Sequence, residues 1–147
     1  MILRKEQRPQ QQDIEVLITY PEENKTVERI VSFINSLNEI IQCNSNGRIK
    51  TISISDIYYV ESVDKIAVVY CEKNNYRTKH RLYQLYEKLI DKGFVQISKY
   101  CILNINKLDS IKPLFNSRME ATLTNGARLY VNRKYIDSIE KKLMENG

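Results

Sequence analysis

The chain has 147 residues, 42% hydrophobic and 28% charged, a composition typical of one globular domain with at most a small addition. It has no run of 18 or more apolar residues, and its opening MILRKEQRPQQQD lacks an apolar core, so we expect no membrane span, no secretory signal and a cytoplasmic location. The formal charge of +5 is concentrated after residue 75, where cations outnumber anions by seven, so we expect any polyanion to bind the second half.

Residues 1–47 are expected to form an N-terminal strand-helix extension. The first 12 or so residues are polar and Gln-rich, which predicts a frayed tail. The stretch DIEVLITY, residues 13–20, alternates apolar and polar side chains and is typical of a strand. In TVERIVSFINSLNEII, residues 26–41, apolar residues recur at helical spacing, which predicts a helix with Thr26 as its N-cap.

Residues 48–147 are expected to form one domain in which short strands dominate. A helix is predicted over about 82–92 and ended by Gly93, a hairpin turn at Asn125-Gly126, and a further helix at the end of the chain. The predicted strands lie in IKTISI, DIYYVES, KIAVVYCE, YRTKHRL, FVQISKYCILNINKLDSI, RMEATLT and ARLYVN. The fold class is therefore α+β, with seven or eight short strands and three helices.

The three cysteines are scattered along the chain. Cys43, Cys71 and Cys101 show no C-x-x-C spacing, and His80 is the single histidine. A zinc site needs about four such ligands at close spacing, and a disulfide framework needs an even number of cysteines. We therefore expect buried free thiols, no metal site and no cofactor, with His80 an exposed or half-buried strand residue.

Two catalytic motifs lack the context that their chemistry needs. Tyr130 and Lys134 form a Y-x-x-x-K, but Tyr130 falls in a predicted strand and no G-x-G-x-x-G loop is present. Ser62 and Lys65 form an S-x-x-K without the companion motifs of penicillin-binding folds. We therefore expect no catalytic residues and no enzyme activity.

The last helix is predicted to begin with two cations. In LYVNRKYIDSI, residues 129–139, the apolar spacing indicates an amphipathic helix with Asn132 as N-cap, so Arg133 and Lys134 fall in its first turn. A helix N-terminus carries about half a positive charge, so a cation there costs a few tenths of a kcal/mol. Two solvated cations that cost little are one explanation, and a strongly negative ligand at the helix start is the other.

A polar triplet interrupts an otherwise apolar stretch. In FVQISKYCILNINKLDSI, residues 94–111, eight apolar residues can line a core, and Ser98-Lys99-Tyr100 breaks the run. Such a break in a buried segment predicts a tight turn that exposes the triplet. Lys99 and the start of the last helix would then be two exposed basic tips from separate loops.

Four sequence blocks follow one another at distances that match a known family. DIYYVES, RLYQLYEKL, FVQISKYCILNINKLDSI and MEATLTNGARLYVNRKYIDSIEKKL together resemble a LytTR DNA-binding domain over about two-thirds of the chain. The resemblance implies an elongated arrangement of short antiparallel sheets, not a helix-turn-helix. It also implies a bacterial-type transcriptional regulator whose loops enter successive major grooves of double-stranded DNA.

The resemblance extends to base-reading positions. Lys99 matches the middle of a family turn triplet that is usually His, then Arg, Lys or Asn, then Ser. Ser98 and Tyr100 replace the outer two members, and we expect them to contact phosphate. Arg133 matches the family's arginine at the start of the last helix, and Lys65 is the nearest match in the loop after YVES. These three cations are the predicted base contacts.

Chemistry favours separate roles for the remaining cations. Arginine suits the base position because its planar fork can bond guanine O6 and N7 together, whereas Lys134 is a point charge suited to phosphate. If YRTKHRL is a strand, Arg77, Lys79 and Arg81 point to one side. That row could lie along a phosphate backbone, or it could be the solvated face of an edge strand.

The partners are also expectations from the resemblance. One strand and one helix before the domain are too little for a receiver domain, so a stand-alone, response-regulator-like protein without a phosphoacceptor is implied. Beyond DNA, the options are a second copy on repeated sites and a membrane protein that restrains the regulator; no small-molecule substrate is expected. An interpretation from another class stays open, namely a basic adaptor module that binds an acidic protein or a membrane surface.

Overall fold

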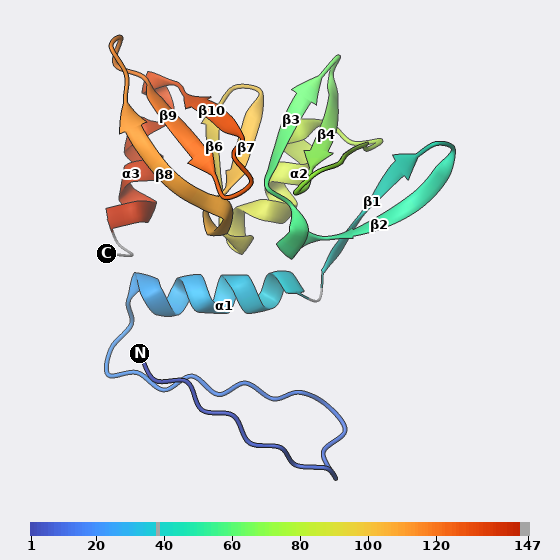
Figure 1. The fold of residues 1–147 in the computed structure, drawn as a ribbon, viewed down its shortest axis with the longest axis vertical. Helices are drawn as coiled ribbons and strands as arrows, with labels where there is room; N and C mark the ends of the chain where they lie inside the picture. The colour runs from blue at the N-terminus through green and yellow to red at the C-terminus, as the bar shows by residue number, and fades with distance from the viewer. Residues whose placement is uncertain (38, 145–147) are drawn as a thin grey trace.

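A computed structural model describes residues 1–37 and 39–144 of the chain (Figure 1). Residue 38 of the predicted first helix and residues 145–147 of the predicted domain lie outside the described residues. The helices are α1 (Lys25–Leu37), α2 (Leu82–Leu89) and α3 (Ile136–Met144). The strands are β1 (Ile40–Ser45), β2 (Arg48–Ser53), β3 (Tyr59–Val63), β4 (Ile66–Tyr70), β5 (Asn75–Arg77), β6 (Phe94–Ser98), β7 (Cys101–Asn104), β8 (Leu108–Pro113), β9 (Met119–Leu123) and β10 (Arg128–Val131).

The strands form two antiparallel sheets. One has seven strands in the order β2-β1-β5-β4-β3-β7-β6, and the other has three in the order β10-β9-β8. Each pairing in both sheets is antiparallel. The predicted α+β arrangement of short antiparallel sheets is confirmed. The described residues hold more strands than predicted, because β1 lies where the sequence predicts no strand and the stretch 94–111 divides into three strands.

Strands β6 and β7 stand between two hydrophobic cores. Phe94 and Ile102 pack on the side of α2, whereas Val95 and Leu103 pack on the side of the three-stranded sheet and α3. Successive side chains of a strand point to opposite faces, so a strand covered on both faces becomes a continuous apolar run. The turn between β6 and β7 is therefore held by a strand pair whose two faces are both buried.

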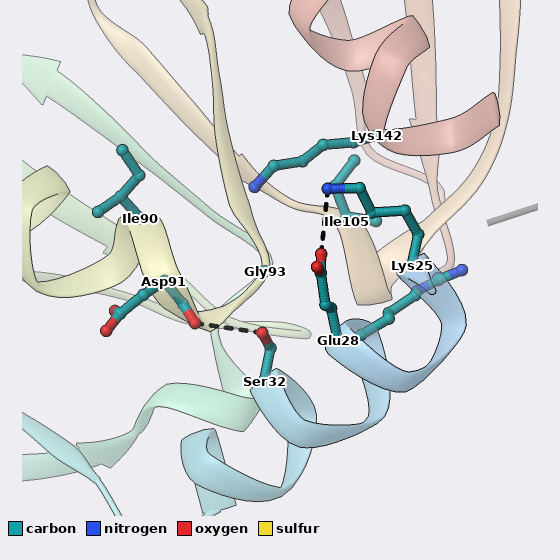
Figure 2. Close-up of a pocket in the computed structure, with 9 residues that line it drawn as sticks. Lys25, Glu28, Ser32, Ile90, Asp91, Gly93, Ile105 and Lys142 are labelled. Atoms are coloured by element: carbon teal, nitrogen blue, oxygen red, sulfur yellow. Dashed lines mark hydrogen bonds and ion pairs between the residues drawn. The ribbon is translucent and has the colours of Figure 1, made fainter. Parts of the chain in front are cut away.

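Helix α1 is fastened to the domain by polar contacts. Arg29 Nε donates to Asn106 Oδ1 at 3.2 Å, and Ser32 Oγ donates to the carbonyl of Asp91 at 3.2 Å. Figure 2 shows the second contact beside a hollow of about 230 Å³ between α1 and the domain. The helix therefore lies on the domain through specific polar partners.

Both ends of α1 differ from the prediction. Its cap is Asn24, whose Oδ1 accepts the N–H of Val27 at 3.0 Å, and not Thr26, because the helix begins at Lys25, two residues earlier than predicted. Its last residue is Leu37, and the predicted helical residues 40–41 belong to β1. The alternate burial of β1 and the left-handed turn that follows it favour a hairpin there, which local helical spacing does not reveal.

The predicted strand over residues 13–20 is absent. None of these residues belongs to a helix or strand, and Ile14 and Leu17 are exposed. Ile18 is half-buried and lines a hollow with Val27 of α1. The prediction failed because a strand needs a neighbouring backbone with free N–H and C=O groups, and a helix satisfies its own.

The predicted strand YRTKHRL is shortened to β5. After it, the Thr78 hydroxyl donates to the carbonyl of Ala67 at 2.8 Å, and the N–H of Ala67 donates to the carbonyl of His80 at 2.9 Å. The chain thus stays beside β4 without a regular ladder, and the period of two ends at Arg77. His80 is exposed and lies outside the strand, which corrects its predicted place.

The two glycines predicted to end a helix and to form a hairpin turn are found at those places in the structure. Gly93 follows α2 and its 3₁₀ extension with φ of +87°, and Gly126 closes the β9–β10 hairpin with φ of +88°. Left-handed φ angles are accessible to glycine at little cost, so both positions favour it.

Among the helices of the described residues, none combines the length and apolar character that a membrane crossing requires.

Candidate nucleic-acid interface

The turn between β3 and β4 presents Lys65 at its tip. Asp64 and Lys65 both have left-handed backbone angles, with φ of 52° and 68°, and the turn lies between the paired residues Val63 and Ile66. Two left-handed central residues are typical of the hairpin turn that fits the twist of its strands. The Lys65 side chain is exposed there.

The turn between β6 and β7 is the one predicted at Ser98-Lys99-Tyr100. Lys99 and Tyr100 are exposed, and the N–H of Tyr100 donates to Ser98 Oγ at 3.1 Å. The carbonyl of Tyr100 accepts the N–H of Ser62 in β3 at 2.8 Å. The two turns are therefore joined through backbone, and Figure 1 shows both pointing to the same edge of the molecule.

A hollow of about 350 Å³ lies between these two turns. Lys65 lines it from one turn and Lys99 from the other, while Arg81 lines it from the start of α2. Its lining also includes the aromatic rings of Tyr83 and Tyr100. Basic groups interleaved with aromatic rings are typical of surfaces that contact nucleic acid.

The start of the last helix adjoins the β6–β7 turn. The N–H of Asn132 donates to the carbonyl of Ile97 at 2.9 Å, next to the irregular pairing of β6 with β7. Arg133 and Lys134 follow in a 3₁₀ turn, Arg133–Tyr135, that leads into α3, and both are exposed. A single backbone hydrogen bond thus joins the residue before Arg133 to the residue before Ser98, the first residue of the triplet.

The predicted side-chain cap at Asn132 is absent. Asn132 occupies the N-cap position, but its side chain makes no capping hydrogen bond, and its carbonyl accepts the N–H of Tyr135 at 2.9 Å. The prediction failed because the first turn is 3₁₀, in which the backbone carbonyl of the cap satisfies that N–H. Other N–H groups at the helix start remain available to an anion.

The four principal cations have no carboxylate partner among the described residues. No Asp or Glu oxygen there lies within 4.0 Å of the charged nitrogens of Lys65, Lys99, Arg133 or Lys134. Lys99 Nζ lies 5.7 Å from the centroid of the Tyr100 ring, and Lys134 Nζ lies 5.7 Å from that of Tyr135. Both amines therefore have a weak aromatic contact that leaves their charge uncompensated.

The other two predicted phosphate contacts, Arg77 and Lys79, lie apart from this group. Both are exposed, and neither lines the hollow between the two turns. The shortened strand removes the reason for expecting them to share one side with Arg81. Of that predicted row, the structure brings only Arg81 to the hollow.

Sequence reasoning missed two features of this edge. The sequence predicts Arg81 as part of a strand, although its place directly before an amphipathic helix also indicates a helix start. The second feature is the β8–β9 turn, which reaches the same edge in Figure 1. It carries the fully exposed Phe115, and Arg118 lies with its guanidinium 5.6 Å from the Tyr130 ring. The turn-favouring pair Asn116-Ser117 directly after this phenylalanine was the available signal.

The three cysteines lie in or against the two hydrophobic cores. All three are free; Cys43 and Cys101 are buried and Cys71 is half-buried. Burial raises the pKa of the Cys43 and Cys71 thiols to about 11, and it also raises the pKa of Cys101. A raised pKa keeps a thiol protonated and a poor nucleophile or ligand. Within the described residues, no three His, Cys, Asp or Glu side chains gather closely enough to hold a metal ion.

Comparison with protein families gives a match over most of the strand-rich region. A model of the LytTr DNA-binding domain matches residues 47–144. A LytTr DNA-binding domain of known structure from Bacillus cereus has the same fold, with a TM-score of 0.65 and 25% sequence identity. That alignment covers 71% of this chain and 95% of the Bacillus domain.

Individual relatives carry names of regulators. The sensory transduction protein LytT of Enterococcus faecalis is 28% identical over 106 residues, which cover 72% of this chain and 44% of the relative. The LytT protein of Bacillus anthracis is 33% identical over 63% of this chain and 37% of its own. This chain thus spans less than half the length of these two relatives. An uncharacterized HTH-type transcriptional regulator of Staphylococcus aureus is 26% identical over 84% of each chain.

Proposed function

Since the chain belongs to the LytTr DNA-binding domain family, we propose that it is a transcriptional regulator that reads specific sequences in the major groove of duplex DNA. The resemblance of the four sequence blocks to this family is thereby confirmed. The observation that carries the proposal is the meeting of three unpaired basic tips: Lys65, Lys99 and Arg133 come from three loops, and backbone hydrogen bonds join their segments. A regulator of this kind acts in the cytoplasm, where the DNA is.

Base reading is assigned to these three side chains. Arg133 has the planar fork that bonds guanine O6 and N7 together, and it lies on a backbone segment fixed to β6. Lys99 and Lys65 each present one charged donor from a tight turn, so they can reach single acceptor atoms such as O6 or N7. Loops held at fixed spacing on packed strands suit reading of neighbouring groove positions.

Phosphate contact is assigned to the surrounding polar groups. Lys134 follows Arg133 at a helix start, where the helix dipole and free N–H groups also favour an anion. Ser98 and Tyr100 offer hydroxyl groups beside Lys99, and such groups commonly bond phosphate oxygens. Arg77 and Lys79 extend the basic surface along β5 and the segment after it, and they act through long-range attraction.

The remaining partners are part of the proposal. A second copy of the chain on repeated sites is one, since two linked reading surfaces bind repeated sites more tightly than one. A membrane protein that restrains the regulator is the other, and its support comes from the family resemblance alone. No metal or small molecule has a role in the proposed contacts.

Selection from a random duplex library tests the proposal. We expect an enriched motif, and an affinity for it that falls with salt at a slope of about −0.9 per phosphate neutralised. The Lys99→Ala/Arg133→Ala double variant is the control, since it should remain folded and lose the motif. Retention that is indifferent to salt, with no enriched motif, would contradict the proposal and favour the basic adaptor interpretation.

A further inference from the structure

Within the described residues, no strand lies beside the outer edge of β2. This strand ends the order of the seven-stranded sheet, and Arg48, Ile49, Lys50 and Thr51 on it are exposed. An edge strand directs the N–H and C=O groups of every second residue outward, where another strand can pair with them. Figure 1 shows β1 and β2 as an arm at the side of the molecule.

The side chains of β2 favour an acidic partner strand. Arg48 and Lys50 are two residues apart and therefore share one face, and like charges would oppose pairing of β2 with another β2. On the other face Ile49 is 69% exposed, which is unusual for a large apolar residue of a sheet. The edge thus offers two cations on one face and an uncovered apolar side chain on the other.

The segment 13–18 of the same sequence has the matching pattern. Asp13 and Glu15 alternate with Ile14 and Val16, and the stretch 9–24 contains four carboxylates and no Lys or Arg. The alternation is that of a strand, yet the segment has no strand partner in the single chain. Its apolar side chains therefore remain in solvent where a sheet edge would cover them.

The two patterns fit in either strand direction. When Ile14 is placed opposite Ile49, the two carboxylates of the segment fall beside the two cations of β2, in parallel or antiparallel order. Opposite charges and apolar pairs across neighbouring strands are each stabilising. In the single chain, the outer edge of β2 and the segment 13–18 both lack a neighbouring strand, and this pairing would supply one to each.

We propose that two copies of the chain associate by exchange of this segment, each adding residues 13–18 to the β2 edge of the other. In the single chain, the segment lies beside α1, where Ile18 and Val27 line one hollow. Figure 1 shows α1 between that segment and the sheets, so the helix separates the segment from its own β2. Reciprocal exchange makes both contacts identical and closes the assembly at two copies.

This dimer leaves the DNA-reading edge uncovered. The turns between β3 and β4 and between β6 and β7 point to a different edge from that of β2 (Figure 1). The exchange thus deepens the proposed function by describing how the second copy of the chain would bind the first. The contact itself needs no DNA. It is tested without DNA, so its failure and the failure of the proposed function are distinguishable.

The mass of the full chain in solution is the first measurement. We expect sedimentation of micromolar protein at low salt to give a species near twice the chain mass of 17.4 kDa. Val16→Pro removes an N–H from an exposed segment outside any helix or strand, so it should abolish the dimer and leave the fold unchanged. A wild-type chain that sediments as a monomer, or a dimer that survives Val16→Pro, overturns the proposal.

Charge exchange gives the sharper test. The double variants Asp13→Lys/Glu15→Lys and Arg48→Glu/Lys50→Glu each place like charges together in either strand direction, and each should weaken self-association by roughly tenfold or more. Glu22→Lys/Glu23→Lys changes the net charge by the same amount as the variant of the segment, at residues outside it, and should leave the dimer intact. An equimolar mixture of the two weakened variants should restore dimers, because each segment then meets an opposite charge on its partner. Variants that remain separate when mixed, or pairing of the segment within one chain, overturn the exchange.

Discussion

The N-terminal 24 residues and the β6–β7 pair carry comparable apolar side chains, which are exposed in the first region and buried in the second. Ile14 and Leu17 are 88% and 82% exposed, whereas Phe94 and Ile97 are each fully buried. Residues 13–20 of the first stretch and both strands of the second are predicted as strands from the sequence. The difference is that β6 and β7 have a paired backbone and a packed layer on each face, while the N-terminal segment lies on one helix. Apolar patterning therefore predicts a strand only where a free sheet edge is within reach.

The comparison predicts the largest effect for a matched pair of leucines. Leu103→Ala in β7 removes a fully buried side chain and should lower the free energy of unfolding by about 2–5 kcal/mol. Leu3→Ala removes an exposed side chain and should change it by less than about 0.5 kcal/mol. Urea unfolding followed by circular dichroism measures both. Similar losses at the two positions would show that the N-terminal segment is packed like the core.

A matched pair of arginines comes next and concerns DNA. Arg133→Ala should weaken binding to the selected site by about 1–3 kcal/mol and relax selection at one or two base pairs. Arg4→Ala removes the same charge from the N-terminal segment and should leave base selection unchanged. Fluorescence anisotropy with matched and mismatched duplexes measures the difference.

The stability of the free protein is the control for this pair. Arg133→Ala should keep the melting temperature or raise it slightly, because a cation is removed from a helix start. A lower melting temperature with DNA affinity intact would identify Arg133 as a structural residue and contradict its assigned role.

A smaller effect is expected for a pair of lysines. Lys134→Ala should weaken all duplex sequences about equally and reduce the salt slope by roughly one, as expected for a lost phosphate contact. Lys5→Ala in the N-terminal segment should leave the slope unchanged. Titrations at several salt concentrations measure it. A change of sequence preference at Lys134 would instead assign a base contact to that side chain.

The smallest effect compares a half-buried thiol that follows β4 with an exposed thiol in the N-terminal segment. Because burial raises the pKa of Cys71 to about 11, its alkylation by iodoacetamide should be slow at neutral pH and should keep rising as pH increases toward 11. A thiol introduced by Gln12→Cys in the N-terminal segment should react faster and level off above its ordinary pKa of about 8.5. Mass spectrometry of timed samples distinguishes the two profiles. Equal profiles would contradict the burial of Cys71.

The same pKa shifts predict a direction for stability. The folded-state pKa values of Cys43 and Cys71 lie above their ordinary value, so the stability they contribute is complete at neutral pH and is lost as pH rises through about 11. A melting temperature that rises between pH 9 and 11 would contradict this sign.

The sequence alone determined the local features of this protein. Ser98-Lys99-Tyr100 interrupts an apolar run, so an exposed turn followed directly, and the glycines at 93 and 126 marked the end of a helix and a hairpin. The strand-dominated fold class followed from patterns of the same short range, and the family resemblance followed from the order of such patterns along the chain. Such features depend on neighbours within a few residues, and the chain carries that information in its order.

Only the tertiary structure decided which of these features meet. Lys65, Lys99 and Arg81 are distant in sequence, and the hollow that they line exists because β3 pairs with β7 and α2 packs beneath them. Residues 40–41 fitted helical spacing as well as a strand, and pairing with β2 selected the strand. Residues 13–20 met the local conditions for a strand and lacked the partner. Strand formation depends on a hydrogen-bonded neighbour supplied by distant sequence, which local periodicity does not encode.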